Sequence, residues 1–285
     1  MLIPALLFFF VFKYVPILGS FIAFKDYNIY EGLWDSEWVG FKWFIQLFTE
    51  DRFLRLLWNT LIINMYQIIF AFPVPIIIAS LLNEIRMMYY KRTVQTIIYL
   101  PHFLSWAIVY GLAFMFLSVD TGLLNNWLNS IGLESVHFLQ KAEYFRTIIV
   151  TSGIWKSAGW GTIIFLAALA GISPSLYEAA RIDGAGRWKQ FLHITLPGLT
   201  PAIVILFLLE VGNMMELGFE QIWIFLNPMT YSTGDVLDTF NYRAGIVEGN
   251  YSFTTAIGIF KSGIGFVLLI IVNRLSKAIT GEGIY

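Results

Sequence analysis

The sequence contains no cysteine, and few of its residues carry a charge. Without cysteine the protein has no disulfides, no thiolate metal ligands and no cysteine nucleophile. Charged residues make up 13% of the 285 residues, whereas an average soluble domain carries about 25%. Hydrophobic residues make up 58%, and the formal net charge is -1. This composition excludes a water-soluble globular protein, and it shows no basic surface for nucleic acid.

Six apolar stretches are long enough to cross a bilayer, which takes about 20 apolar residues per helix. The first stretch has no basic segment before it and no small-residue cleavage site after it, so it is interpreted as a span and not as a signal peptide. We predict an all-α membrane protein in which residues 1–285 form a single domain. The predicted spans are residues 2–24, 58–82, 95–117, 146–171, 199–217 and 255–275.

Basic residues predict the orientation, because Lys and Arg near the ends of spans stay on the cytoplasmic side. The loops 83–94 and 172–198 and the C-terminal tail are rich in Lys and Arg, whereas the loops 118–145 and 218–254 hold only Lys141 and Arg243. The loop 25–57 is mixed in charge, and alternation of the spans places it outside. We predict a multi-pass protein of the bacterial cytoplasmic (inner) membrane with both termini in the cytoplasm.

A short helix is predicted at about residues 174–183, within the cytoplasmic loop 172–198. Ser173 can cap it, Pro174 suits the first helical position, and Gly184 can end it. The helix therefore lies between the fourth and fifth predicted spans.

This predicted helix has small side chains at its centre and charged side chains beside them. Ala179 and Ala180 allow close approach by another protein. The flanking charges are Glu178, Arg181 and Asp183. Spacing alone fits a docking element and a connector helix on the bilayer surface equally well.

The same loop carries a spaced motif. Glu178-Ala179-Ala180 is followed after three residues by Gly184, after nine more by Ile194, and one residue later by Leu196-Pro197. The pattern resembles the EAA motif of ABC-importer permeases at every defining position. This resemblance implies the type I ABC-importer permease fold, in which the loop helix is a coupling helix that seats in a cleft of the ATPase. The coupling residues that it implies are Glu178, Ala179, Ala180, Asp183 and Gly184.

Further segments extend the resemblance over nearly the whole chain. They are similar to the LplB-type branch of carbohydrate permeases, which import oligosaccharides, including acidic ones such as alginate fragments. Such proteins usually carry a basic stretch before the first span, and because it is missing here we expect a truncated amino terminus. The segments include Lys13-Tyr14-Val15-Pro16, Asn59-Thr60-Leu61, Leu100-Pro101-His102-Phe103, Gly218-Phe219-Glu220-Gln221 and Tyr251-Ser252-Phe253.

Partners follow from the resemblance and from one missing motif. The chain has no Gly-Lys pair, and therefore no P-loop for ATP. We expect a transport subunit and not an enzyme, with no cofactor of its own, and with ATP and Mg held by two separate ATPase subunits. The other implied partners are a second permease subunit, an extracytoplasmic solute-binding protein, the lipid bilayer and an oligosaccharide substrate, with no nucleic acid among them.

Ionisable and polar side chains within the spans are candidates for the substrate path, because such groups at membrane depth normally face a cavity or a partner. Indole rings and hydrogen-bonding groups are suited to sugars, and they occur around residue 156 and at the end of the fifth span. The candidates are Asn213, Glu216, Phe219, Glu220, Gln221, Lys156, Trp160 and Lys261.

Structural roles compete with this assignment. Lys156 can extend to the membrane interface. Glu216 and Glu220 can mark the exposed end of a span, or pair with Lys261 or Lys156. The cations would suit an acidic sugar together with His102, but carboxylates are present too, so the charge of the substrate stays open. The three histidines are too scattered to suggest a metal site.

The sequence predicts a subunit that forms half of the translocation pathway of an ATP-driven carbohydrate importer, and its resemblance implies that the substrate is an oligosaccharide. A secondary, ion-coupled carrier is the alternative; it would place its ion site at interrupted helices and would not need the EAA pattern. A membrane enzyme would need a clustered acid–base or metal constellation, and the sequence shows no such cluster.

Overall fold

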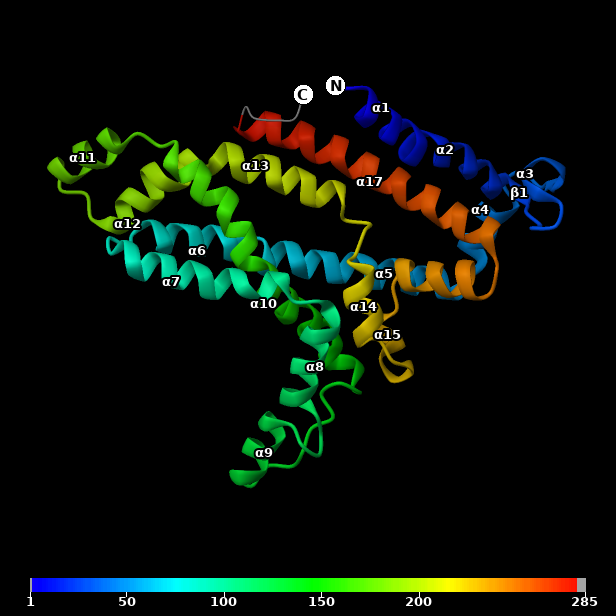
Figure 1. The fold of residues 1–285 in the computed structure, drawn as a ribbon, viewed down its shortest axis with the longest axis horizontal. Coiled ribbons are helices and arrows are strands. Elements are labelled where there is room, and N and C mark those ends of the chain that lie inside the picture. Colours follow the sequence, from blue (N-terminus) through cyan, green and yellow to red (C-terminus); the bar gives the residue numbers. More distant parts are fainter. Residues whose placement is uncertain (1, 281–285) are drawn as a thin grey trace.

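The computed structural model describes residues 2–280, and its long helices run side by side along the longest axis of the molecule (Figure 1). One end carries the short helices α11 (Pro174–Ile182) and α12 (Arg187–Gln190). The opposite end carries a hairpin in which β1 (Lys25–Asp26) pairs antiparallel with β2 (Glu37–Trp38). Residue 1 and residues 281–285 of the predicted domain lie outside the described residues.

Within residues 2–280, five helical segments are long and apolar enough to cross a membrane, and a bent pair supplies a sixth. The first crossing comprises α1 (Ile3–Phe9), η1 (Phe10–Tyr14), α2 (Val15–Gly19) and η2 (Ser20–Phe24). The second comprises α5 (Asp51–Tyr66), η3 (Gln67–Ala71) and α6 (Pro73–Asn83). The bent pair comprises α7 (Met88–Tyr99) and η4 (Leu100–Phe103), followed by α8 (Trp106–Leu117). The last three crossings are α10 (Ala142–Ala170), then α12 with η5 (Phe191–Thr195) and α13 (Leu196–Gly212), and finally α17 (Tyr251–Thr280).

Short elements connect these crossings. The hairpin end adds α3 (Gly32–Asp35) and α4 (Lys42–Thr49), and α9 (Leu123–Ser130) follows α8 on an arm that projects from the bundle (Figure 1). Between α13 and α17 lie α14 (Phe219–Phe225), η6 (Pro228–Thr230), α15 (Tyr231–Gly234), α16 (Leu237–Asn241) and η7 (Tyr242–Val247).

Two predicted spans differ from the structure. A single helix over 95–117 is wrong, because the chain bends by 103° between Phe103 and Trp106. The fifth span was expected at 199–217, but its helix starts earlier, at Arg187, and ends at Gly212. The residues that follow Gly212 form a turn, which matters for the site described below.

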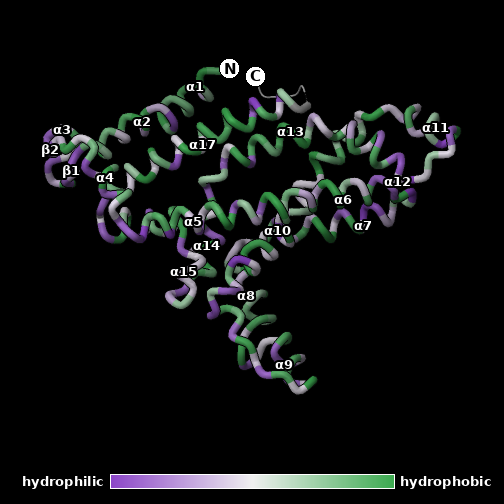
Figure 2. The backbone as a smooth tube through the Cα atoms, turned by 180° about the vertical axis from the view of Figure 1, so that it is seen from behind, coloured by the Kyte–Doolittle hydropathy of each residue, from purple (hydrophilic) through white to green (hydrophobic). Residues whose placement is uncertain are grey.

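The apolar side chains pack into three clusters along the bundle. Hydrophobic residues follow the long helices, and hydrophilic ones gather at the hairpin and around α11 and α12 (Figure 2). The cluster nearest the hairpin includes Trp43, Phe53 and Phe253, and the cluster nearest α11 includes Phe165 and Leu199. The middle cluster joins α5, α8, α10 and the loop before α17 through Ile63, Val109, Phe145, Ile149, Leu217, Ile222, Phe225 and Val236.

Glycines allow close approach between helices at two contacts. A Cβ atom built on Gly159 of α10 would lie 1.9 Å from the carbonyl oxygen of Ile98 in α7. A Cβ atom on Gly212 of α13 would lie 2.7 Å from Cδ1 of Leu269 in α17. The first glycine thus packs against the backbone of its neighbouring helix, and the second against a leucine side chain.

We expect Gly159→Ala to destabilise the bundle, because the added methyl group meets backbone and not a flexible side chain. Overpacking of this kind costs about 1–3 kcal/mol. Gly111→Ala is a matched control, since Gly111 also lies within a helix and its Cβ would meet nothing within 4 Å. Thermal unfolding of the detergent-solubilised protein measures both, and equal melting temperatures would contradict the contact.

Candidate functional site

The bend between η4 and α8 begins at a proline. Pro101 has no N–H to donate to the preceding turn, so the α7 helix cannot continue unchanged. The chain tightens into η4, Leu104 and Ser105 are extended, and the Ser105 hydroxyl then caps α8 by accepting the N–H of Ile108 at 3.4 Å. The helix therefore ends inside the bundle, beside α10.

Lys156 of α10 binds the backbone released at this bend. Its Nζ donates to the carbonyl oxygen of His102 at 2.7 Å, and it lies 5.4 Å from the ring centroid of Trp106. A hydrogen bond from a charged donor is among the stronger kinds. The ammonium group of Lys156 thus already has an acceptor within the chain.

The ring of His102 stacks on Trp160 of α10. Their centroids are 4.5 Å apart and the ring planes differ by 5°, while Phe103 meets Trp160 edge-on at 6.1 Å. Nδ1 of His102 is buried and has no hydrogen-bond partner among residues 2–280. Trp160 keeps 47% of its surface exposed. The pair therefore offers an accessible aromatic face beside the bend.

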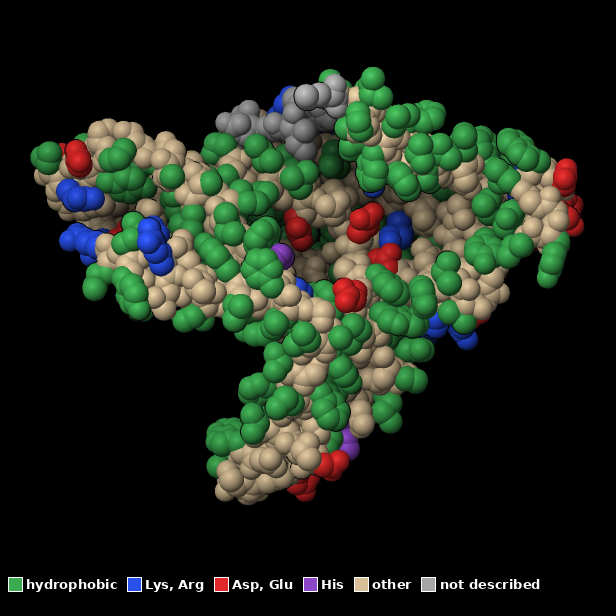
Figure 3. Space-filling model, in the orientation of Figure 1, with side chains coloured by type: hydrophobic (Ala, Val, Ile, Leu, Met, Phe, Trp, Pro, Cys, Tyr) green, Lys and Arg blue, Asp and Glu red, His purple; other side chains and the backbone are tan. Residues whose placement is uncertain are grey.

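This aromatic pair lies in a cleft of about 410 Å³ between α10 and α13. Glu210 of α13 and Asn213 supply polar groups from the wall opposite Trp160, and Glu210 forms no ion pair within the described residues. Acidic side chains, a basic one and a histidine gather around the hollow in this face of the molecule (Figure 3). The other lining residues are Ala71, Phe72, Pro75, Gly153, Ile154, Ser157, Ala158, Gly161, Ile164, Phe165, Leu206 and Leu209.

The segment after the cleft folds back against the bundle. Gln221 of α14 is buried, and its amide donates to the carbonyl oxygen of Ile149 at 2.7 Å and to the Ser152 hydroxyl at 3.1 Å. Phe219 contacts Trp223 and Tyr242, whose rings pack together. Gln221 therefore fastens α14 to α10, and the aromatic rings join α14 to η7.

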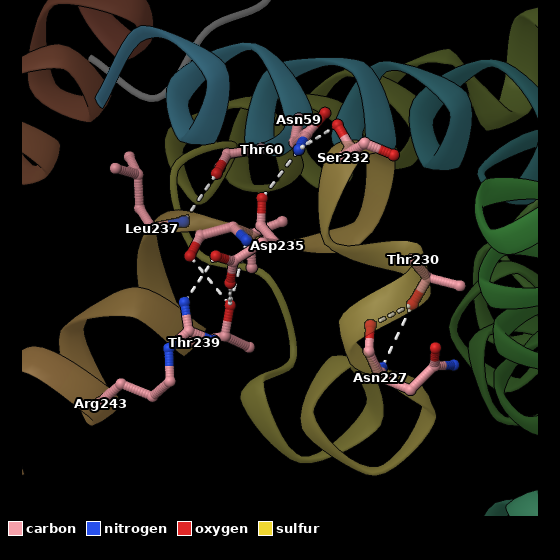
Figure 4. Close-up of polar contacts among 10 residues, drawn as sticks. Asn59, Thr60, Asn227, Thr230, Ser232, Asp235, Leu237, Thr239 and Arg243 are labelled. Carbon is pink, nitrogen blue, oxygen red and sulfur yellow. Dashed lines mark hydrogen bonds and ion pairs between the residues drawn. The ribbon is translucent and has the colours of Figure 1, made fainter. Parts of the chain in front are cut away.

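A polar network fastens the same segment to α5 (Figure 4). Asn59 donates to the carbonyl oxygen of Asp235 at 2.9 Å, and Thr239 donates to the Asp235 carboxylate at 2.7 Å. Arg243 binds the other carboxylate oxygen at 2.5 Å. Burial alone lowers the pKa of Arg243, but the hydrogen bond and charge of Asp235 outweigh it and raise that pKa. Arg146 of α10 completes the network by donating to Asn59 at 2.8 Å.

A second buried charge pair links α16 to α17. Lys261 of α17 keeps 8% of its surface exposed, and its Nζ contacts the Asp238 carboxylate. The other oxygen of Asp238 accepts the N–H of Leu217 at 3.1 Å. One carboxylate therefore joins α17 to the turn that follows α13.

The short helix α11 extends from the far end of the bundle (Figure 1). The predicted side-chain cap by Ser173 is wrong, because its hydroxyl pairs with that of Ser175 instead. Pro174 does occupy the first turn, and Gly184 ends the helix with φ +75. Tyr177 holds the helix against η5 through Thr195, with 3.0 Å between their hydroxyl oxygens.

Much of the surface of α11 is exposed. Glu178, Ala179, Asp183 and Gly184 are exposed, Ala180 is half-buried, and Ile182 is 87% exposed. A cavity of about 590 Å³ lies between this helix, α12 and the end of α6, lined by charged residues that include Glu84, Glu178, Arg181 and Arg187. An exposed isoleucine and a charged rim on a short, thin helix suit a protein–protein contact.

The model of the family described as "Binding-protein-dependent transport system inner membrane component" matches residues 71–281. The chain belongs to this family. It is a permease component of a binding-protein-dependent ABC importer with the type I permease fold, as the EAA pattern predicted. The alternative of an ion-coupled carrier loses its support.

Relatives of this permease align over its whole length. Protein LplB of Bacillus subtilis (strain 168) is 48% identical over 285 residues, which cover 100% of this chain and 90% of that protein. The polygalacturonan/rhamnogalacturonan transport system permease protein YteP of the same strain is 47% identical and is covered to 89%. A chain in the crystal structure of a bacterial alginate ABC transporter, in complex with an alginate pentasaccharide-bound periplasmic protein, is 42% identical, with a TM-score of 0.92 and coverage of 100% and 95%.

The structure divides the predicted substrate-path residues of the permease into three groups. Trp160 and Asn213 line the cleft, and Lys156 lies at its edge through its bond to His102. Gln221 and Lys261 bind partners within the chain, and Phe219 lies in the aromatic group. Glu216 and Glu220 are exposed, and neither lines the cleft. The assignment of all eight residues to the path stays a prediction.

Three residues of the permease that matter in the structure were missing from the candidates. Glu210 is an ionisable residue within the predicted span 199–217, and this signal alone could have placed it in the candidate site. Asp235 and Asp238 gave no such signal, because they lie in a predicted loop. Their partners, Asn59 and Lys261, are distant in the sequence.

Proposed function

We propose that this permease forms half of the pathway by which an ATP-driven importer carries an oligosaccharide across the bacterial cytoplasmic membrane. The observation that carries the proposal is the cleft, where the His102–Trp160 stack faces Glu210 and Asn213. A sugar ring offers an apolar face to an aromatic ring and hydroxyl groups to a carboxylate or an amide. Binding sites typically combine apolar walls with a few polar groups in this way.

The names of relatives support a carbohydrate substrate. YteP is named for polygalacturonan and rhamnogalacturonan, and the solved relative belongs to an alginate transporter. All three polymers are saccharides. The substrate class of this permease is therefore taken to be an oligosaccharide, without a choice between neutral and acidic members.

The remaining partners follow from the surfaces of the chain. We propose residues 1–285 as one permease domain with α11 as its coupling helix, and an ATPase subunit, loaded with ATP and Mg, that contacts Glu178, Ala179, Ala180, Asp183 and Gly184. A second permease would close the hollow seen in Figure 3, and each permease would engage one of two ATPases. A solute-binding protein would dock at the hairpin end, opposite α11, with both termini in the cytoplasm.

Uptake by proteoliposomes tests this function. Co-expressed with a second permease and an ATPase, the chain should form one stable complex that takes up oligosaccharide only with ATP inside the vesicle and binding protein outside. The chain purified alone should neither bind ATP specifically nor transport. Uptake by the chain alone, driven by an ion gradient, would overturn the proposal and restore the carrier alternative.

A further inference from the structure

The turn at residues 213–218 forms part of the wall of the cleft. Asn213 lines the cleft, and Glu210 lies one helical turn before it in α13. The turn is held at both ends. Before it, Gly212 packs against α17, where the Cβ of Gly265 would lie 3.0 Å from the Gly212 carbonyl oxygen. Near its other end, the N–H of Leu217 donates to Asp238.

The carboxylate of Asp238 has two partners, Lys261 and the N–H of Leu217. Lys261 is a buried cation within a span, which is costly without a partner. Its ion pair with Asp238 neutralises it, and the second carboxylate oxygen of Asp238 is left to accept the Leu217 N–H. Leu217 itself is buried, so that N–H would otherwise lack an acceptor.

Neither member of the pair lines the cleft. Asp238 comes from α16 and Lys261 from α17, and Asp238 contacts the chain at Leu217, two residues before α14 begins. We propose that Asp238 is a positioning residue for transport: its carboxylate, neutralised by Lys261, accepts the Leu217 N–H, and the turn fixed in this way places Asn213 in the cleft. This inference rests on the proposed role of the cleft as the substrate path.

Two double variants distinguish the role of Asp238 as a hydrogen-bond acceptor for Leu217 from a role in packing alone. Asp238→Leu with Lys261→Met removes both charges and the acceptor for the Leu217 N–H. Asp238→Asn with Lys261→Met also removes both charges, but the amide oxygen can still accept that N–H. Replacing a buried ion pair by apolar side chains is often neutral for stability, so both variants should assemble and keep basal ATP hydrolysis.

The expected results differ between the two variants. The Leu/Met variant should lose about tenfold or more of its uptake, since small misplacements of substrate-positioning groups are costly. The Asn/Met variant should transport near the wild-type rate. Because the chain has no cysteine, Glu216→Cys can be labelled with a maleimide in each background. Labelling at 216 should speed up in the Leu/Met variant only, while labelling of Ser157→Cys on the opposite wall should stay unchanged.

Several results would overturn the positioning role. Wild-type uptake in both double variants, equal losses in both, labelling at 216 that does not change, or absence of either variant from the membrane would each do so. These failures are distinct from failure of the proposed function. If the unmodified complex takes up no oligosaccharide, the importer proposal fails first, whereas normal uptake by the Leu/Met variant leaves that proposal intact and removes only the positioning role of Asp238.

Discussion

Glu178→Lys should abolish substrate-stimulated ATP hydrolysis while the permease still reaches the membrane in normal amounts. Glu178 is exposed and forms no ion pair within the described part of the chain, so its replacement should change stability little. In the complex, a reversed charge on the coupling surface would face the ATPase. Loss of an interface hot spot costs about 2–4 kcal/mol, or roughly 30- to 1000-fold in affinity.

The measurement is ATPase activity of the reconstituted complex with and without substrate-loaded binding protein. Glu134→Lys is the matched control, because Glu134 is also exposed but lies in the loop after α9, far from α11 along the chain. This control should keep full stimulation. Normal stimulation of ATP hydrolysis in Glu178→Lys would contradict the proposal that α11 is the coupling helix.

Trp160→Ala should reduce oligosaccharide uptake much more than it reduces ATP hydrolysis stimulated by the binding protein. The substitution removes the ring that stacks on His102 and faces the cleft. Losing a large aromatic contact surface is worth about 2 kcal/mol, or roughly 30-fold in binding. Trp160→Phe keeps an aromatic face and should retain more of the uptake.

Trp155 provides a matched control for this experiment. It lies on the same helix and is 47% exposed, as Trp160 is, but it does not line the cleft. Trp155→Ala should therefore transport normally. Equal losses in Trp155→Ala and Trp160→Ala would show that the indoles stabilise the helix and do not bind substrate.

The spans and the coupling loop could be predicted because their signals are local. Long apolar runs indicate membrane helices whatever their neighbours, and the spacing from Glu178 to Pro197 lies in one loop. The family assignment that it predicted was confirmed. The bend at residue 104 was missed although Pro101 marks it, because prolines are tolerated within membrane helices and composition alone does not tell a kink from a break.

The roles of the buried charges could not be predicted, because they depend on pairs far apart in the sequence. Lys261 was assigned to the substrate path as a charge within a span, and its partner Asp238 lay in a segment expected to be an outer loop. Lys156 was likewise recognised as unusual, but the acceptor it binds is a backbone carbonyl freed by the unforeseen bend. Such assignments require knowledge of how the helices pack against one another.

The length of the second crossing has a mechanical consequence. At about 1.5 Å per residue, the 33 residues of Asp51–Asn83 form a rod of about 50 Å, whereas the hydrocarbon layer of a bilayer is about 30 Å thick. The rod therefore continues beyond the lipid, and at its Asp51 end Phe53 and Leu56 pack with Trp43 and Leu47 of the hairpin region.

A tilt of this rod by about 10° would move its far end by about 9 Å. Phe53 and Leu56 pack against the hairpin region and would move it with them. A small rotation at the α11 end of the rod would therefore become a large displacement at the hairpin end, where we propose that the solute-binding protein docks.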